Sequence, residues 1–489
     1  MNDKTAPRRP RDLTSGPIAS TLLMFALPVL GSNVLQSLNG SINSVWVGRF
    51  LGETALAATS NANLVLFLLL GTMFGIGMAA TILVAQSVGA RDMAEARRIV
   101  GTSATFFFLV SLVFALGGWL WVDQILGLLG TPADVMPLAR AYLVIIFAAV
   151  PAANLLSFVM TILRGAGDSR TPFYFMALAV LLDIVLNPLL IIGYGPIPGF
   201  GIAGSALATL IGQTVSVAAI LILLYRRKHP LRLAGADLAL LKPDPRLLRI
   251  VVTKGIPMGL QMIVISMAAL VLMGMVNGYG SQVAAAYGIA AQLWTYVQMP
   301  ALAIGAAVSS MAAQNVGARR WDRIGRIAAA GVGFNLLLTG TLVLVLYVFD
   351  RSLLGLFLAA DGAAVDIAQH INNVASWSFI LFGVTIVLFA TVRATGAVMP
   401  PLIILVISVL FIRTGFAYAL RDTLGQEALW WSFPAGSIAS LALAAAYYRF
   451  GRWRTMHMIE EERPAAGEPP DTGLGVPRGR AGLAPQGES

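Results

Sequence analysis

The sequence predicts an all-α, polytopic membrane protein with twelve transmembrane helices in two pseudo-symmetric six-helix lobes. Three observations predict this fold class: the composition, the number of long apolar segments, and an internal repeat. Of the 489 residues, 57% are hydrophobic and only 11% are charged, whereas a soluble globular chain carries roughly 25% charged residues. The deficit of charge extends over nearly the whole length and therefore excludes an ordinary water-soluble protein.

Apolar segments of about 20 residues, long enough to cross a hydrocarbon core as helices, recur along the chain. Residues 1–16 are polar, and the first apolar segment lacks a small-residue cleavage site, so we expect it to be a span and not a cleaved signal. The predicted spans are 18–45, 54–82, 100–121, 137–162, 172–194, 202–225, 250–276, 284–311, 326–348, 370–392, 400–420 and 428–448.

The net charge of +10 is distributed as expected for a chain that is oriented in a membrane. Lys and Arg collect in the cytoplasmic segments of membrane proteins. If both termini are cytoplasmic, the predicted cytoplasmic segments hold nearly all of the basic residues. Only Arg49, Arg140, Arg351, Arg413 and Arg421 lie elsewhere. We therefore expect a multi-pass protein of the bacterial inner (plasma) membrane with both termini in the cytoplasm, and no binding of nucleic acid.

An internal repeat divides the chain into two halves. The segment Ala85–Arg91 reappears, with one difference, as Ala313–Arg319, and nearly the same offset aligns Pro28 with Pro257. It also aligns Arg164, Gly167 and Pro172 with Arg393, Gly396 and Pro401. Each copy holds six spans, so both halves enter the membrane in the same orientation. Parallel repeats of this kind are common in carriers that bind their substrate between the halves.

The repeat and the composition set the expected domain boundaries. A long basic loop that contains prolines separates the two lobes, and the end of the chain is rich in Pro, Gly and Glu, a composition typical of disorder. The expected parts are a cytoplasmic N-terminal tail 1–16, an N-lobe 17–225, a cytoplasmic inter-lobe loop 226–249, a C-lobe 250–450 and a disordered cytoplasmic C-terminal tail 451–489.

The inventory of reactive side chains argues against a metal centre or an enzyme. The chain has no cysteine, which excludes disulfides and Cys-ligated metals. His229, His370 and His457 lie far apart. We expect no metal site, no cofactor and no catalytic residues, because a single mid-membrane carboxylate without a partner His or second acid is a poor catalytic constellation.

One acidic residue stands out by its position. An ionised carboxylate inside a bilayer costs roughly 2.5–3.5 kcal/mol, and such residues usually handle ions or substrates. Asp183 lies in the middle of a predicted span, whereas Asp350 and the other acids fall at span ends or in loops. Asn187 lies one turn further on the same face, and Pro188 frees a backbone carbonyl. These groups together predict an H⁺ or Na⁺ site; the alternative is that Asp183 only hydrogen-bonds neighbouring helices.

Several motifs, in this order, resemble those of the multidrug and toxic compound extrusion (MATE) family. They are Val47–Gly52, Ala85–Arg91, Leu163–Asp168, Gly201–Thr209 and Ala313–Arg319. The resemblance covers about residues 17–450. It implies a two-lobed secondary antiporter that exports amphipathic, often cationic drugs or metabolites by alternating access, in exchange for inward H⁺ or Na⁺.

Within this resemblance, the pattern is closer to the DinF-like branch than to the NorM-like branch. The DinF-like branch places an N-lobe cation site on spans one, five and six. The matching positions here are Asn43, with Asn39 and Gln36 on the same face, then Asp183 and Asn187 in exchanged order, and Thr209. The acids that the NorM-like branch carries on spans seven and ten have no counterpart, so no C-lobe cation site is expected. A lone carboxylate favours H⁺, while Na⁺ at Asp183 and Asn187 stays open.

The substrate cavity is expected to be lined by aromatic and amide side chains, because aromatic faces attract cations. The candidates are Gln36, Trp46, Tyr287, Gln292, Trp294, Tyr296, Gln298 and Arg413. For each aromatic or amide residue taken singly, a place in the interfacial belt or in helix packing is the alternative. Arg413 lies one step from the repeat counterpart of Asp183, and either lines the cavity or extends to the membrane interface.

Two other functions fit a two-lobed carrier less well. A flippase for lipid-linked saccharides, from the same superfamily, would need several basic residues in its cavity, and the sequence places only Arg413 deep in a span. A channel does not require a duplicated lobe. The expected partners are small amphipathic or cationic substrates and the lipid bilayer, and we expect a monomer.

Overall fold

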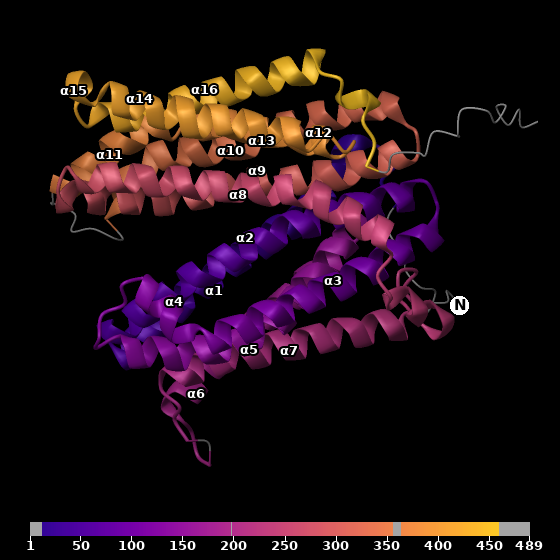
Figure 1. Cartoon of the computed structure of the whole chain (residues 1–489). Helices are drawn as coiled ribbons and strands as arrows, with labels where there is room; N and C mark the ends of the chain where they lie inside the picture. The colour runs from indigo at the N-terminus through magenta and orange to yellow at the C-terminus, as the bar shows by residue number, and fades with distance from the viewer. Residues whose placement is uncertain (1–11, 197, 356–362, 459–489) are drawn as a thin grey trace, which may run out of the picture. The chain divides into compact units, whose positions relative to one another are not determined.

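The computed structural model describes residues 12–196, 198–355 and 363–458, and secondary structure over these ranges is helical, without a β-strand. The helices form two groups that follow the order of the chain, as Figure 1 shows by colour. The first group contains α1 (Ile18–Leu51), α2 (Glu53–Gly89), α3 (Met93–Leu120), α4 (Val122–Leu128), α5 (Met136–Gly165), α6 (Arg170–Ile192) and α7 (Ile202–Arg226).

The second group repeats this arrangement with two interruptions. Between the groups, η1 (Gly235–Leu241) packs on α3. The elements of the second group are α8 (Pro245–Asn277), α9 (Ser281–Gly317), α10 (Trp321–Leu354), α11 (Ala363–Ala375), α12 (Ser378–Arg393), α13 (Met399–Leu405), η2 (Val406–Arg413), α14 (Thr414–Ala419), α15 (Arg421–Leu424), α16 (Glu427–Phe450) and η3 (Trp453–Thr455).

The number of spans agrees with the predicted all-α membrane fold. Among the described residues, ten helices are long and apolar enough to cross a membrane, and the bent pair α11 and α12 brings the number to eleven. The 37-residue helix α2 occupies the second position of the first repeat. With α2 included, each half contributes six spans, as the repeat predicts.

Two predicted spans are not simple helices. The span predicted at 370–392 consists of α11 and α12, which meet at a bend of 45°. The span predicted at 400–420 contains the π-helical segment η2 between α13 and α14. A π-helix inserts a residue into the helical register and occurs frequently at functional sites. Hydropathy does not reveal either feature, because both segments remain apolar throughout.

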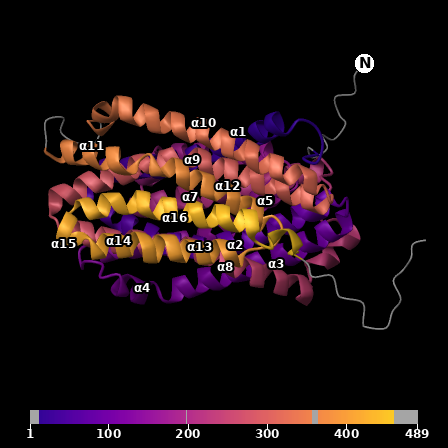
Figure 2. The same ribbon diagram turned by 90° about the horizontal axis from the view of Figure 1, so that it is seen from above.

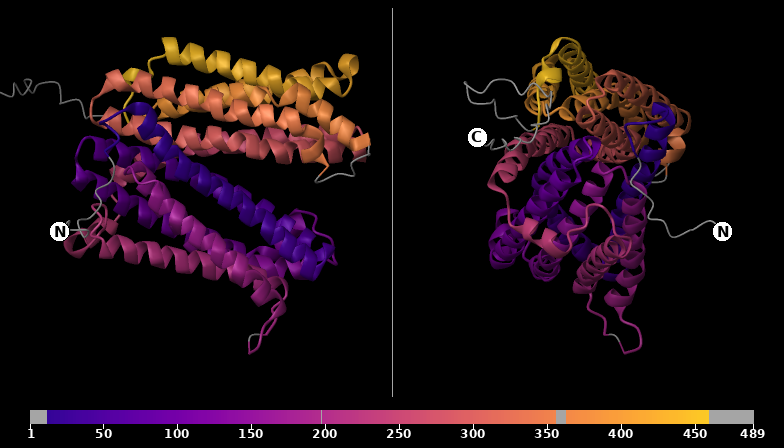
Figure 3. Two further views of the ribbon diagram at one scale, coloured as in Figure 1. Left: turned by 180° about the vertical axis from the view of Figure 1, so that it is seen from behind. Right: turned by 90° about the vertical axis from the view of Figure 1, so that its right-hand side faces the viewer.

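The two halves pack closely where helix backbones cross without side chains between them. Helix α2 packs on α8 and α9, and α1 packs on α9 (Figures 2 and 3). A Cβ added at Gly75 of α2 would lie 2.1 Å from the backbone nitrogen of Gly259 and 2.4 Å from the carbonyl oxygen of Gly255 on α8. Small residues that let membrane helices approach in this way stabilise them through close packing.

A pair of glutamines joins the two halves at the end of the molecule where the repeated segments Ala85–Arg91 and Ala313–Arg319 lie. We call this end the repeat-loop end. Gln86 Nε2 donates to the carbonyl of Ala394 at 2.7 Å, and Gln314 Nε2 donates to the carbonyl of Gly165 at 2.9 Å. The repeat makes the two glutamines equivalent, and likewise the two carbonyls. Each half therefore holds a loop of the other half through the same contact.

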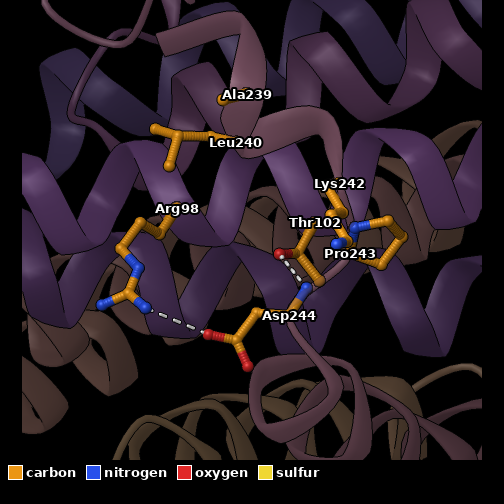
Figure 4. Close-up of a pocket in the computed structure, with 7 residues that line it drawn as sticks. All are labelled: Arg98, Thr102, Ala239, Leu240, Lys242, Pro243 and Asp244. Atoms are coloured by element: carbon orange, nitrogen blue, oxygen red, sulfur yellow. Dashed lines mark hydrogen bonds and ion pairs between the residues drawn. The ribbon is translucent and has the colours of Figure 1, made fainter. Parts of the chain in front are cut away.

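The inter-lobe loop is anchored on α3 (Figure 4). Arg98 pairs with Asp244 at 3.2 Å, and the Asp244 backbone N–H donates to Thr102 Oγ1 at 3.1 Å. Nearby, Arg97 pairs with Asp237 at 3.1 Å. These contacts attach the chain that leaves the N-lobe to the surface of that lobe before α8 begins.

The ends of the described chain are packed. The backbone N–H of Leu13 donates to Gln314 Oε1 at 3.2 Å, and the Leu13 side chain is buried. Trp453 is also buried, and its carbonyl accepts from Thr395 Oγ1 at 2.8 Å. The prediction of disorder from residue 451 onward is therefore wrong for 451–458, because an aromatic side chain anchors this stretch. Residues 1–11 and 459–489 of the predicted tails lie outside the described residues.

Candidate functional site

Asp183 lies near the middle of α6 and faces the interior of the N-lobe. Its side chain is 4% exposed, and that of Asn187, one turn further, is 1% exposed. A carboxyl group in this position does not face lipid, so its surroundings are set by the neighbouring helices α1 and α7, both of which pack on α6.

Hydrogen bonds from three helices meet at this point. Thr209 Oγ1 on α7 donates to Asp183 Oδ1 at 3.0 Å, and Asn39 on α1 also hydrogen-bonds the carboxylate. One turn away, Asn187 Nδ2 donates to Asn43 Oδ1 at 3.1 Å. The structure thus brings together all five residues predicted for cation coupling, and their role stays a prediction.

Two acceptor atoms in this cluster lack a hydrogen-bond partner. The side-chain oxygens of Asn39 and Asn187 are both buried without one. An unsatisfied buried acceptor costs about 1–3 kcal/mol. Two amide oxygens beside a carboxylate form a set of oxygen ligands of the kind that hard cations prefer. The cluster therefore has both a titratable group and spare acceptors for a small cation.

Close approach of α7 to α6 makes this cluster compact. A Cβ added at Gly204 would lie 2.1 Å from the carbonyl oxygen of Leu190, and one at Gly212 would lie 3.2 Å from the carbonyl oxygen of Ala179. These glycines flank Thr209 on α7, so the absence of a side chain at both allows the threonine hydroxyl to reach Asp183.

Sequence reasoning missed two members of the cluster. Ser205 Oγ donates to Asn43 Oδ1 at 2.8 Å, and the buried side chain of Tyr142 on α5 also hydrogen-bonds Asn43. Ser205 lies four residues before Thr209, and this helical spacing would have placed both hydroxyls on one face. Tyr142 belongs to no motif, and no signal in the sequence points to it.

The predicted substrate residues lie in different environments. Trp46 stacks on Phe50, with ring centroids 5.4 Å apart. Tyr287 and Trp294 are buried in an aromatic cluster with Phe379, Trp430 and Phe433. Gln36 and Gln292 are exposed, and Tyr296, Gln298 and Arg413 are partly buried. Contact with a substrate remains a prediction for all of them.

Asp350 lies near the end of a span, as predicted, but its burial was not foreseen. Helix α10 continues to Leu354, beyond the predicted end of the span, and Asp350 is 2% exposed. Asn372 Nδ2 donates to Asp350 Oδ1 at 2.7 Å, and Trp294 Nε1 donates to Asn372 Oδ1 and Ser376 Oγ, both at 3.0 Å. These bonds link α9, α10 and α11, the first helix of the bent pair.

We expect Asn372→Ala to destabilise the C-lobe. The change removes the donor to Asp350 and one acceptor of Trp294, and each buried group left unsatisfied costs about 1–3 kcal/mol. Thermal unfolding of the purified protein should show a clear decrease in the midpoint. Asn373→Ala is the matched control, because Asn373 is exposed and its side chain makes no hydrogen bond with another described residue. Equal midpoints for both variants would contradict a stabilising network.

Within the described parts of the chain, no group of three or more His, Asp or Glu side chains is placed to hold a metal ion. His370 Nε2 lies 2.7 Å from Glu427 Oε1 at an exposed position, without a third ligand.

Comparisons with known proteins agree with this architecture. The family model MatE matches residues 28–189 and 257–419, one segment in each half. The chain is 37% identical over 432 residues to the probable multidrug resistance protein YoeA of Bacillus subtilis, covering 88% of this chain and 93% of the relative. It is 32% identical over 451 residues to the probable multidrug resistance protein YpnP of the same species, covering 92% and 99%.

A solved structure described as the outward-facing conformation of a multidrug resistance MATE family transporter has the same fold. It superposes with a TM-score of 0.81 at 21% identity and covers 93% of this chain and 98% of that chain. Both repeats match the family model, and two relatives exceed 30% identity over nearly their full length. The chain therefore belongs to the MATE family of multi-pass membrane transporters.

Proposed function

We propose that this protein is a secondary active antiporter that exports amphipathic or cationic drugs or metabolites in exchange for inward H⁺ or Na⁺. The observation that carries this proposal is the buried carboxyl of Asp183 within a polar shell from α1, α6 and α7. A charged group in that position costs free energy unless an ion neutralises it. The relatives' names, which describe multidrug resistance proteins, support drugs as the exported class.

Coupling would work through the hydrogen bonds of this shell. Binding of H⁺ to Asp183 turns an acceptor-only group into one that also donates a hydrogen bond. The new hydroxyl needs an acceptor, which the unpaired side-chain oxygen of Asn39 or the hydroxyl of Thr209, now a donor at 3.0 Å, would supply after rearrangement. Rearrangement of these bonds changes the packing of α1 and α7 against α6. An inward-moving positive charge also gains about 2.3 kcal/mol per 100 mV of membrane potential.

The orientation follows from the distribution of basic residues. The repeat-loop end carries Arg91, Arg97 and Arg98 on one half, and Arg319 and Arg320 on the other, so the positive-inside rule assigns this end to the cytoplasm. The two glutamine contacts close the halves there. With the two halves in contact at this end, the substrate path would be closed toward the cytoplasm.

Transport by the purified protein in sealed vesicles tests the proposal. Ethidium, an amphipathic cation, is supplied while a pH gradient, an Na⁺ gradient or no gradient is imposed. We expect the pH gradient to drive accumulation of ethidium against its concentration gradient. Accumulation with Na⁺ alone would assign the site to Na⁺, for which the two unpaired amide oxygens supply ligands. Equal ethidium levels under all three conditions would contradict an antiporter.

A further inference from the structure

Arg413 is a basic side chain held within the C-lobe. Its Cζ atom lies 3.7 Å from the ring centroid of Phe433 on α16. One turn later on α16, a Cβ added at Gly436 would lie 2.9 Å from the Arg413 Cβ. The arginine side chain therefore extends along a face of α16 on which a ring supports the guanidinium and a glycine leaves room for the aliphatic part.

The guanidinium has no anionic partner among the described residues. None of the ion pairs or hydrogen bonds found in these parts of the chain includes Arg413. Nε is buried without a partner, whereas the residue as a whole is only partly buried. The terminal nitrogens make no hydrogen bond or ion pair with another described residue, so they are free to donate.

This arrangement leaves part of an electrostatic cost uncompensated. An arginine keeps its charge in proteins, and removal of a charge from water costs far more than one ring contact returns. A cation–π contact contributes about 0.5–2 kcal/mol. The remaining stabilisation must come from water or from an anion that reaches the terminal nitrogens.

The backbone around Arg413 is specialised. Arg413 is the last residue of the π-helical segment η2. One extra residue in a helix rotates the following side chains by about 100°, since an α-helix has 3.6 residues per turn. The insertion therefore sets the face on which Arg413 lies, and in this structure that face is toward Phe433 and Gly436 of α16.

The two lobes differ in charge at nearly equivalent positions. In the aligned repeat, Arg413 is one residue beyond the counterpart of Asp183. The N-lobe thus holds a buried acid whose shell can bind a cation, while the C-lobe holds an unpaired base beside an aromatic ring.

We propose that Arg413, supported by Phe433, forms a subsite that binds a carboxylate group of a ligand. The planar guanidinium matches a carboxylate through two parallel hydrogen bonds, and the ring of Phe433, 3.7 Å from Cζ, supports it from one side. This subsite rests on the proposed function in one respect, because its ligand is taken to be the exported compound. It predicts that the preferred compounds carry a carboxylate in addition to any cationic group.

Two dyes that differ by one group test this subsite. Rhodamine 110 carries a free carboxylate, and rhodamine 123 is its methyl ester. Equilibrium binding of each dye to the purified protein in lipid nanodiscs is measured by fluorescence anisotropy without any ion gradient. We expect tighter binding of rhodamine 110. Arg413→Gln should weaken binding of rhodamine 110 by about tenfold to a hundredfold, the range for a hydrogen bond to a charged group, and should change rhodamine 123 by less than twofold.

Arg421→Gln is the matched control. Arg421 belongs to the same lobe and also stacks on a ring, 4.7 Å from Tyr418, but it is exposed and paired with Asp422 at 3.2 Å. This variant should bind both dyes as the wild type does, and Arg413→Lys should restore part of the preference. Equal weakening of both dyes by Arg413→Gln would indicate a structural role and overturn the proposal.

An absent preference in the wild type, or failure of both dyes to bind, would also overturn it. Because the measurement uses no gradient, its outcome is independent of coupling at Asp183. If the protein does not prefer rhodamine 110 but still transports ethidium under a gradient, only the subsite is contradicted. If it prefers rhodamine 110 but shows no gradient-driven transport, only the antiport is contradicted.

Discussion

Asp183→Asn is expected to abolish ion-driven transport and leave the folded protein in the membrane. Asparagine has the size of aspartate, and its side-chain oxygen can still accept from Thr209 Oγ1, which donates at 3.0 Å in the wild type. The amide cannot, however, be ionised, so it neither takes up H⁺ nor attracts Na⁺. Ethidium accumulation in vesicles under the driving gradient should fall to the level of protein-free vesicles.

An exposed acid provides the control for this prediction. Asp123 pairs with Arg140 at 2.8 Å, and its side chain is 60% exposed. Asp123→Asn removes the same charge from the surface, where an ion pair contributes about 0–1 kcal/mol, and should transport ethidium normally. Both variants should be recovered from the membrane in equal amounts. Wild-type accumulation by Asp183→Asn would show that ion coupling takes place elsewhere.

Gly89→Ala is expected to prevent close packing of the two halves at the repeat-loop end. The added Cβ would lie 2.0 Å from the carbonyl oxygen of Gln314, and backbone cannot move aside as the end of a side chain can. Overpacking costs about 1–3 kcal/mol, which corresponds to a shift of about fivefold to 150-fold in the equilibrium between packed and separated halves. Gly317→Ala should act in the same way, because its Cβ would lie 1.9 Å from the Gln86 carbonyl oxygen.

Amide hydrogen exchange measures this effect. Peptides that cover 84–92 and 312–320 should exchange faster in Gly89→Ala and in Gly317→Ala than in the wild type, and driven transport should decrease. Gly288→Ala is the control, since a Cβ at that helical position meets no atom within 4 Å. Unchanged exchange in both loop variants would contradict the close contact between the halves.

The sequence predicted the arrangement of spans and the members of the N-lobe cluster because both depend on regular helical spacing. Asp183 and Asn187 are one turn apart, and the members on the first and sixth spans are those that the family resemblance implies. The bend between α11 and α12 was not predicted, because the apolar run of 370–392 continues across it.

The burial of Asp350 was not predicted for a related reason. Hydropathy ends the span at residue 348, but α10 continues to Leu354 through a non-helical residue, Phe349. Burial of the carboxyl depends on Asn372 and on Trp294, which lie far apart in the sequence and meet only in the folded C-lobe. Hydrogen bonds between residues so far apart in the sequence leave no pattern in a short stretch of it.

The equivalence of the two glutamine contacts has a consequence for how opening proceeds. Each contact is a neutral hydrogen bond, worth about 0.5–1.5 kcal/mol net, so neither alone keeps the halves together for long. While one glutamine contact persists, it keeps the two halves close together at this end. The other glutamine then remains near its carbonyl acceptor and can bond to it again. Half-released molecules should therefore be short-lived, and the two contacts should break together.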